Sequence, residues 1–165
     1  GRTLVHAAPD VGRRGPDVEL APGETGLLVD VDGMRWYALF ADEDVPERAR
    51  MVSVPISSGR QDWRTPLGST RIVSRIKDPT WTPPQSIREE ALERGETLPD
   101  VVPAGPDNPL GQHALRLALP GYLIHGTNKP AGIGMQVTHG CIRMYIRDAE
   151  RLYALVSIGT PVYIR

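Results

Sequence analysis

The chain has one cysteine, Cys141, which lies in a glycine-rich stretch that also carries two of the four histidines. His139 precedes it by two residues and His125 by sixteen. A thiol attacks a carbonyl carbon as the thiolate, and a neighbouring imidazole helps to form that thiolate. The small Gly140 lets backbone N–H groups approach a developing oxyanion. These residue types and their spacing indicate nucleophilic chemistry at Cys141, with the amides of Gly140 and Cys141 as candidate oxyanion donors.

Two other interpretations of Cys141 remain open from the residues alone. A free cysteine commonly behaves as a small buried hydrophobe. A zinc site is also conceivable, because His113, His125, His139 and Cys141 all carry zinc-ligating atoms. Structural zinc sites usually combine two close ligand pairs, however, and this sequence offers only the pair His139 and Cys141.

Either nearby histidine could act as the base for Cys141. His139 lies two positions away, so in an extended segment its side chain points in the same direction as the thiol. His125 falls at the end of a predicted strand, 122–125, from which it can face Cys141 across the site. Both rings could lie within hydrogen-bonding reach of the thiol. The spacing by itself does not choose between them.

The stretch 125–143 resembles the signature of the L,D-transpeptidase catalytic domain, the YkuD family. The family pattern is His-Gly-Thr, a spacer, and then Ser or Thr followed by His-Gly-Cys, an aliphatic residue and Arg. Here it reads His-Gly-Thr at 125–127 and Thr-His-Gly-Cys-Ile-Arg at 138–143. Residues 78–111, which begin Asp-Pro-Thr-Trp-Thr-Pro-Pro, are similar to the periplasmic branch that includes lipoprotein-anchoring enzymes. The resemblance covers roughly residues 26–165.

The resemblance implies a role for each residue of the motif. It makes Cys141 the nucleophile and His125 the base, and it gives His139 a supporting part that orders the site by hydrogen bonds. Arg143 has a guanidinium fork suited to a substrate carboxylate. The other residues assigned to the substrate site are Thr138, Gly126, Thr127 and Trp81.

The resemblance also implies peptidoglycan chemistry. Cys141 would attack the third residue of a donor tetrapeptide stem, release the terminal D-alanine and form a thioester. The side-chain amine of another stem peptide, or the lysine of an envelope lipoprotein, would then accept the acyl group. No cofactor or metal is needed, carbapenems are expected inhibitors, and the periplasm or cell envelope is the expected location.

Two alternatives use the same motif. In an L,D-carboxypeptidase, water would replace the amine acceptor, and in a wall-binding module the site would be catalytically inactive. After Arg143, residues 144–148 depart from the Asn-Glu-Asp-Ile-like continuation of many relatives. Acceptor choice could therefore differ in this chain.

Composition excludes several other classes of protein. At 165 residues the chain is expected to form one domain. A net charge of -1, from 19 basic and 20 acidic residues, leaves no electrostatic footprint for nucleic acid. No apolar run approaches the roughly 20 residues that span a bilayer. The opening residues show no signal-peptide pattern, so we expect the sequence to represent a mature form.

Sixteen prolines and seventeen glycines favour short strands joined by turns over a helical bundle. Asp32-Gly33 predicts a two-residue hairpin. Strands are predicted at 27–31, 34–40, 50–54, 70–76, 113–119, 122–125 and 161–164. The predicted fold is therefore mainly β, which the resemblance makes a β-sandwich or barrel-like catalytic core with a few short helices.

The remaining segments are predicted from caps and composition. Residues 1–25 are expected to form an N-terminal arm or linker before the catalytic domain, 26–165. The Pro-rich insertion 78–111 is expected to be a flap beside the substrate groove. Within it, Ser86 to Glu89 predicts a capping box for a helix that Gly95 stops. A second helix is predicted from an N-cap at Asp148 to Val156.

Overall fold

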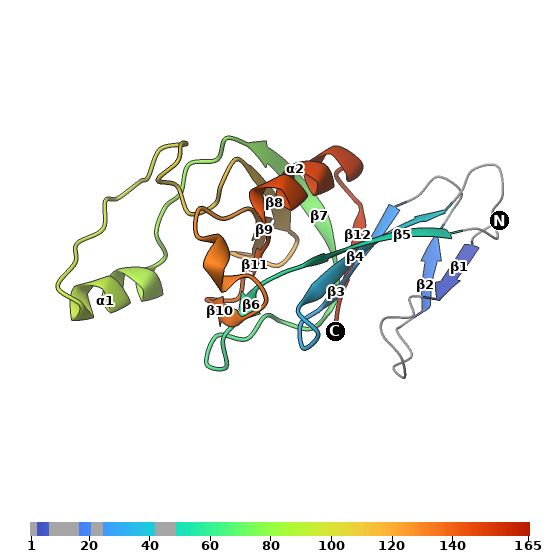
Figure 1. The fold of residues 1–165 in the computed structure, drawn as a ribbon, viewed down its shortest axis with the longest axis horizontal. Coiled ribbons are helices and arrows are strands. Elements are labelled where there is room, and N and C mark those ends of the chain that lie inside the picture. Colours follow the sequence, from blue (N-terminus) through green and yellow to red (C-terminus); the bar gives the residue numbers. More distant parts are fainter. Residues whose placement is uncertain (1–2, 7–16, 21–24, 42–48) are drawn as a thin grey trace.

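The computed structural model describes residues 3–6, 17–20, 25–41 and 49–165, and most of its regular structure is β-strand (Figure 1). The strands of the first half are β1 Thr3–His6, β2 Asp17–Leu20, β3 Thr25–Asp30, β4 Arg35–Ala41, β5 Ala49–Pro55, β6 Ser58–Gly59 and β7 Gly68–Lys77. The elements of the second half are α1 Gln85–Glu93, β8 His113–Leu117, β9 Leu123–His125, the 3-10 turn Pro130–Gly132, β10 Gln136–Thr138, β11 Ile142–Arg143, α2 Ile146–Leu155 and β12 Pro161–Ile164. The prediction of a mainly β fold is confirmed.

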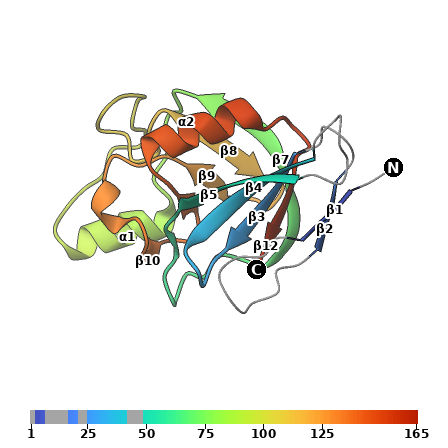
Figure 2. The ribbon, with the colours of Figure 1, turned by 45° about the vertical axis from the view of Figure 1, so that its right-hand side comes forward.

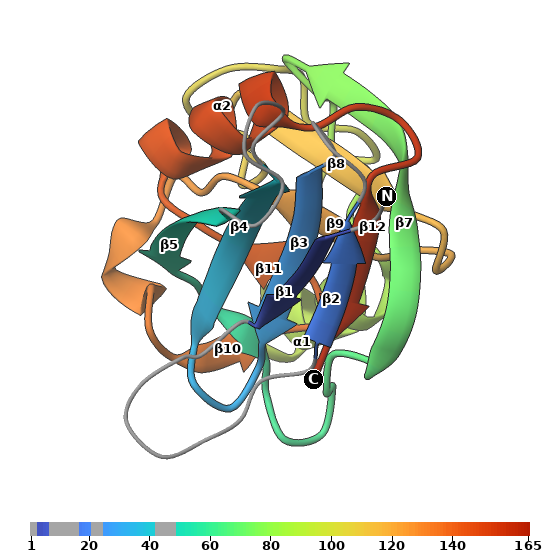
Figure 3. The same cartoon turned by 90° about the vertical axis from the view of Figure 1, so that its right-hand side faces the viewer.

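One eight-stranded sheet, in the order β11-β9-β8-β7-β12-β3-β4-β5, forms the body of the domain. Its pairs are antiparallel except β12 with β3 and β11 with β9, which are parallel. The ten-residue β7 pairs with β8 and with β12, and a register shift between Ile72 and Ser74 interrupts its ladder with β8. Such bulges bend a strand and increase its twist, and the sheet is correspondingly curled (Figure 3).

The curl brings the two ends of this sheet together. Ser57, just beyond β5, forms a bridge with Arg143 of β11, the strand at the opposite end of the order. Ser57 N–H donates to the Arg143 carbonyl at 2.7 Å, and Arg143 N–H donates to the Ser57 carbonyl at 3.0 Å. We call this junction the seam. The motif around Cys141 therefore lies where the curled sheet closes on itself.

The core fills the inside of the curl. Trp36, Ile72, Leu117 and other apolar side chains from both halves of the sheet form one buried cluster. Helix α2 covers this cluster with Ala149 and Leu152 and packs on β8 and β9 (Figure 2). Among the described residues, no helix is both long and apolar enough to cross a membrane.

The Asp32-Gly33 turn differs from its prediction. Asp30 ends β3 and pairs directly with Arg35, the first residue of β4, so the connection contains four residues instead of two. Met34 has a positive φ of 54°, and Gly33 N–H donates to the Asp30 carboxylate at 3.1 Å. The turn therefore depends on a hydrogen bond to the side chain of Asp30. The Asp32-Gly33 pair, on which the prediction rested, does not include that residue.

Both helices begin earlier than predicted. Helix α1 has its N-cap at Pro84 without a side-chain cap, so the predicted capping box from Ser86 to Glu89 is wrong. Helix α2 has its N-cap at Tyr145, which places Asp148 in the first turn, where a carboxylate still favours the helix N-terminus. Gly95, with a φ of 77°, follows α1 as predicted.

Two side chains, Asn108 and Arg88, form most of the side-chain hydrogen bonds described within the insertion between β7 and β8. The buried Asn108 donates its side-chain amide to the carbonyls of Pro79 and Pro103, and it accepts the Leu110 N–H. Arg88 of α1 donates to carbonyls along the segment that follows the helix, those of Leu98, Pro99 and Asp100. The insertion therefore carries its own polar framework, which holds α1 in place.

The segment 1–25 contains β1 and β2, which pair antiparallel from Thr3 opposite Leu20 to His6 opposite Asp17. Residues 1–2, 7–16 and 21–24 lie outside the described residues. The assignment of 1–25 as an arm or linker stays a prediction.

Candidate active site

The register of β9 and β11 places the motif residues on one face of the sheet. Ile124 pairs with Ile142, and both side chains are buried in the core. Because side chains alternate along a strand, the neighbouring pair His125 and Arg143 points to the opposite face, and Cys141 shares the side of Arg143. Burial is the main influence on both neighbours of Arg143, since it lowers the pKa of His125 and raises the pKa of Cys141. The positive charge of Arg143 adds to the first shift and opposes the second. Thus three predicted site residues come together beside the seam.

His125 is buried, and one of its ring nitrogens is committed. The Gly126 carbonyl lies 2.5 Å from Nδ1 and can only accept, so Nδ1 carries the proton. Burial lowers the pKa of His125 to about 4, although the hydrogen bond that Nδ1–H donates to the Gly126 carbonyl acts in the opposite direction. The ring is therefore neutral at physiological pH, and Nε2 holds the free lone pair of a base.

Cys141 is half-buried, and the surroundings of its thiol favour the neutral form. Burial raises the pKa of Cys141, while a hydrogen bond from the Leu123 backbone N–H and the charge of Arg143 act in the opposite direction. The sulfur also lies 3.9 Å from the Gly121 carbonyl oxygen. Since the raised thiol pKa accompanies a lowered imidazole pKa, a resting thiolate–imidazolium pair is disfavoured.

Arg143 presents a partly buried charge without a carboxylate partner. Burial lowers the pKa of its guanidinium, and Nε is buried with no hydrogen bond. Within the described part of the chain, no Asp or Glu forms an ion pair with it. A buried charge that lacks a counter-ion is costly, so this side chain is suited to bind an anion.

The turn from Thr138 to Cys141 is held by hydrogen bonds to its carbonyl groups. Arg60 N–H donates to the Thr138 carbonyl at 3.0 Å, and the Thr65 hydroxyl donates to the Gly140 carbonyl at 2.8 Å. The Thr138 hydroxyl donates to the Cys141 carbonyl at 2.7 Å and accepts the Gly140 N–H at 3.2 Å. The Thr138 side chain is therefore used within the turn, and so is one of the two amides predicted for the oxyanion hole.

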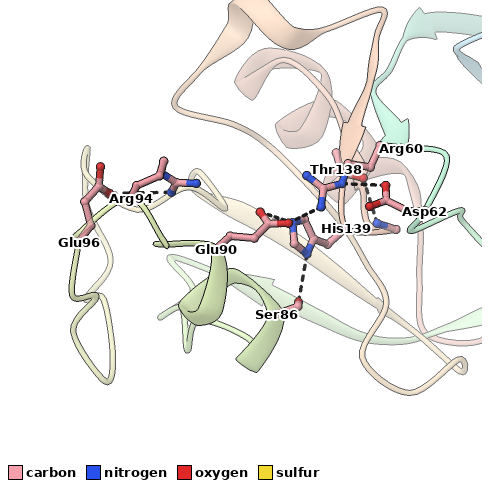
Figure 4. A network of polar contacts seen from close by, with 9 residues as sticks. Arg60, Asp62, Ser86, Glu90, Arg94, Glu96, Thr138 and His139 are labelled. Carbon is pink, nitrogen blue, oxygen red and sulfur yellow. Dashed lines mark hydrogen bonds and ion pairs between the residues drawn. The ribbon is translucent and has the colours of Figure 1, made fainter. Parts of the chain in front are cut away.

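Both ring nitrogens of His139 are bonded to helix α1. Its Nε2 lies 3.1 Å from Glu90 Oε2 and its Nδ1 lies 3.0 Å from Ser86 Oγ, both on α1 (Figure 4). Its ring stacks on Trp63 with centroids 5.1 Å apart and planes 18° from parallel. Both nitrogens are thus engaged by the insertion. Neither Ser86 nor Glu90 was predicted as a site residue, although their spacing of four residues places them on one helical face.

The other predicted residues support the structure around the site. Gly126 N–H donates to the His113 carbonyl at 3.3 Å, and the buried Thr127 accepts the Lys129 N–H at 3.0 Å. Trp81 exchanges two backbone hydrogen bonds with Val102 inside the insertion, at 2.9 and 2.7 Å. The backbone of Trp81 therefore links two segments of the insertion, and none of these contacts places its ring against Cys141.

The four residues considered as zinc ligands are not gathered at one point. His113 packs against Tyr153 with ring centroids 4.8 Å apart, whereas His139 bonds to α1. Across the described residues, no three or more His, Cys, Asp or Glu side chains are grouped so as to hold a metal ion.

Comparison with known proteins identifies the domain. The family profile described as "YkuD: L,D-transpeptidase catalytic domain" matches residues 24–164. The chain belongs to this family. Two relatives from Escherichia coli, the probable L,D-transpeptidases YcfS and YbiS, are 41% and 45% identical over 148 and 139 residues, which are 87% and 83% of this chain. The matches span only 44% and 43% of those proteins, so the chain covers less than half of their length.

Solved structures show the same fold for this L,D-transpeptidase domain. An L,D-transpeptidase from Mycobacterium smegmatis superposes with a TM-score of 0.62 at 21% identity, covering 92% of this chain and 63% of that one. The L,D-transpeptidase LdtMt1, whose structure is a complex with imipenem, superposes with a TM-score of 0.60 at 17% identity, covering 90% and 62%. The curled, mainly β architecture with two α-helices in its described residues is thus that of the family.

Gly140 of this domain should not tolerate a side chain. Its φ is 107°, and a Cβ there would lie 2.7 Å from Tyr122 Cε1. The backbone strain alone costs about 1–3 kcal/mol, and the turn or Tyr122 must also move. We expect Gly140→Ala to lower the free energy of unfolding by more than that strain, as measured by urea denaturation.

Gly159 provides the matched control. Its φ of 95° is also positive, but a Cβ there meets nothing within 4 Å. Gly159→Ala therefore carries backbone strain without the Tyr122 clash. Equal losses of stability in the two variants would show that the contact with Tyr122 contributes nothing.

Proposed function

We propose that this domain is a peptidoglycan L,D-transpeptidase that uses Cys141 as nucleophile and His125 as base. The observation that carries the proposal is the shared face of His125, Cys141 and Arg143 beside the seam, in a chain that belongs to the L,D-transpeptidase family. The hydrogen bonds of the two candidate histidines support the assignment, because His139 has both nitrogens engaged and His125 has only Nδ1 engaged.

The first step transfers an acyl group to sulfur. His125 Nε2 takes the thiol proton as Sγ attacks the carbonyl carbon of the third stem residue. The tetrahedral intermediate then collapses, the C–N bond to D-alanine breaks, and the imidazolium returns the proton to the leaving amine. The described resting structure has no hydrogen bond between His125 and Cys141, and catalytic contacts of this kind often tighten only in the substrate complex.

The second step transfers the acyl group to an amine. The acceptor amine loses a proton to His125, attacks the thioester carbon and displaces the Cys141 sulfur, which is reprotonated by the same imidazole. The Cys141 N–H is the remaining candidate for the oxyanion hole, since Gly140 N–H is bonded to Thr138. Transfer of the proton from a neutral thiol to a neutral imidazole during the attack suits this site, because the charged forms of both groups are disfavoured at rest.

Arg143 is proposed to bind a carboxylate of the donor stem. Its guanidinium lies on the face of Cys141, is partly buried and lacks an acidic partner in the described ranges. An incoming carboxylate would supply the missing counter-ion and hydrogen bonds. This placement would orient the stem so that its scissile carbonyl meets the sulfur.

The proposed partners are peptidoglycan stem peptides, with an envelope lipoprotein as an alternative acceptor, and the proposed location is the periplasm or cell envelope. Cell-wall biogenesis and maintenance of cell shape would be the corresponding processes. Carbapenems are proposed inhibitors, which the imipenem complex of LdtMt1 supports. Because the chain spans only part of its relatives, these proposals concern the activity of this domain.

Product analysis tests the transpeptidase assignment. Purified disaccharide tetrapeptide is incubated with the protein, and a second reaction also contains a peptide that ends in lysine as a lipoprotein mimic. We expect mass spectrometry to show a cross-linked species that equals the two reactants minus one D-alanine. The side-chain amine makes this product because it replaces D-alanine on the same acyl carbon.

The alternatives give different masses. A tripeptide stem without a cross-link would identify an L,D-carboxypeptidase and contradict transfer to an amine. Unchanged tetrapeptide, bound to the protein but not converted, would identify a wall-binding module. Product that contains the lysine peptide would assign the acceptor as lipoprotein-like.

A further inference from the structure

Helix α1 contacts the catalytic turn through a carboxylate that the proposed mechanism does not use. Glu90 Oε2 lies 3.1 Å from His139 Nε2, and Glu90 Oε1 bonds Arg60 (Figure 4). His139 is the residue between Thr138 and Gly140 and lies two positions before Cys141. Glu90 thus connects the insertion to the turn that carries the nucleophile.

Arg60 contacts both this turn and Glu90. Its backbone N–H donates to the Thr138 carbonyl at 3.0 Å, and its guanidinium binds Glu90 and lies 3.1 Å from Asp62 Oδ1. The hydrogen bond from Arg60 lowers the pKa of Glu90, and the nearby His139 acts in the same direction. Glu90 is therefore an anion that is bonded on both oxygens.

The chemistry of these contacts defines one arrangement of protons on His139. A carboxylate oxygen can only accept, so Nε2 carries the proton that points to Glu90. In the neutral ring, Nδ1 is then an acceptor, and the Ser86 hydroxyl donates to it across 3.0 Å. Stacking on Trp63 restrains the ring plane. Glu90 consequently determines both the tautomer of His139 and the place of its ring.

We propose that Glu90 is a positioning residue for the transferase reaction: through His139 it holds the Thr138–Cys141 turn so that the sulfur meets the donor carbonyl. This inference rests on the proposed function, because it concerns how Cys141 is placed for attack. Glu90 contacts neither the thiol nor the base in the described structure, and its effect is transmitted by the ring that it fixes.

A small displacement of the nucleophile is sufficient to slow the reaction. Near-attack geometry requires the reacting atoms about 3–3.5 Å apart, and a misplacement of about 1 Å can cost on the order of a hundredfold in rate. The backbone N–H of Arg60 and the hydroxyl of Thr65 also hold the turn, so loss of Glu90 would loosen it without releasing it. We therefore expect a partial loss of rate rather than a complete one.

Two substitutions separate the charge from the contact. Glu90→Gln keeps the shape of the side chain, and its amide oxygen should face the donors of Arg60. Its NH2 group would then face His139 Nε2, which must become an acceptor. We expect the ring to switch to the Nδ1–H tautomer and to donate to Ser86. Glu90→Ala removes both contacts.

Glu93 provides the matched control, because it is an exposed glutamate on the same helix and forms no side-chain hydrogen bond or ion pair with the described residues. Glu93→Gln and Glu93→Ala make the same changes in side chain and helix propensity. The rate of acylation by a carbapenem is followed by intact-protein mass spectrometry for all variants. Thermal unfolding checks that each variant is folded, and ¹⁵N NMR of the imidazole nitrogens reports the tautomer at alkaline pH.

We expect the maximal acylation rate of Glu90→Ala to fall by about tenfold or more, as for loss of hydrogen bonds to a charged group. Glu90→Gln should lie between it and the wild type and should show the switched tautomer, while the Glu93 variants match the wild type. The inference is overturned if the Glu90 variants acylate at the rates of the Glu93 variants, or if His139 in Glu90→Gln keeps its proton on Nε2. Absence of an adduct in the wild type would instead contradict the proposed function, and the tautomer would still test the hold of Glu90 on His139.

Discussion

Replacement of Cys141 by alanine is expected to abolish the mass increase that a carbapenem produces on the intact protein. The strained lactam carbonyl takes the place of the donor carbonyl, so attack by Sγ opens the ring and leaves the whole drug attached. Cys141 is the only cysteine in the chain, and its side chain is half-buried instead of enclosed. The loss should therefore be complete on the time scale of wild-type acylation, as read by intact-protein mass spectrometry.

The Cys141→Ala experiment also distinguishes acylation from binding. Native mass spectrometry of the variant can still detect non-covalent complexes with stem peptides, because Arg143 and the seam are retained. An adduct that forms equally fast on Cys141→Ala would locate the nucleophile at another residue. Adducts on neither protein would favour the wall-binding alternative.

Replacement of His125 by glutamine should slow acylation by about 10²–10⁴-fold, the usual contribution of a general base. Glutamine can keep a hydrogen bond to the Gly126 carbonyl, but it cannot take the thiol proton at neutral pH. When the acylation rate is measured against carbapenem concentration, the maximal rate should fall by a larger factor than the apparent affinity for the drug. His139→Gln is the informative comparison, since a greater loss in that variant would assign the base to His139.

The pH dependence of wild-type acylation gives a second signature of His125. The pKa of His125 is about 4 in the folded protein because the ring is buried. The base is neutral above that value, so the acidic limb of the rate profile should have its midpoint near pH 4 instead of near the ordinary imidazole value of about 6.5. The limb should be missing from the residual rate of His125→Gln. A midpoint that stays near 6.5 would contradict the role of a buried base.

The same depressed pKa links His125 to folding. Between pH 6.5 and about 4 the unfolded chain binds a proton at this position and the folded chain does not, so the stability conferred by burying the neutral ring is lost as the pH falls. The contribution is about 3 kcal/mol over the whole window. Part of the acid sensitivity of wild-type unfolding should therefore be absent from His125→Gln, and separate unfolding curves are needed to interpret the acidic limb.

The pair of opposite pKa shifts changes the mechanism suggested by the motif alone. Cysteine and histidine in proximity suggest an imidazole that ionises the thiol in advance. Burial instead disfavours the thiolate of Cys141 and the imidazolium of His125 together. Proton transfer coupled to attack is thus the route that this environment supports. Desolvation depends on the packed structure, so the spacing of the two residues could not reveal it.

The position of the insertion is another property that depends on tertiary contacts. Its proline content, its length and a helix ending before Gly95 were predictable, because turn residues and helix stops act locally. Docking of α1 on His139 was not, because Ser86 and Glu90 lie 53 and 49 positions from it in the chain. The N-cap of α1 at Pro84, two residues before the expected cap at Ser86, was not predicted either.

The sequence by itself determined the chemical repertoire and the elements that carry it. The motif residues can be recognised from their order along the chain: a lone thiol, its histidines and Arg143. Strand periodicity placed His125 at the end of β9, because periodicity depends on local chain chemistry. Only the tertiary structure decided which imidazole keeps a free nitrogen. A distant helix bonds both nitrogens of His139, whereas His125 uses only Nδ1, in a bond to the Gly126 carbonyl. Closure of the curled sheet through Ser57 and Arg143 then created the common face, because a seam between the ends of a sheet has no signature along the chain.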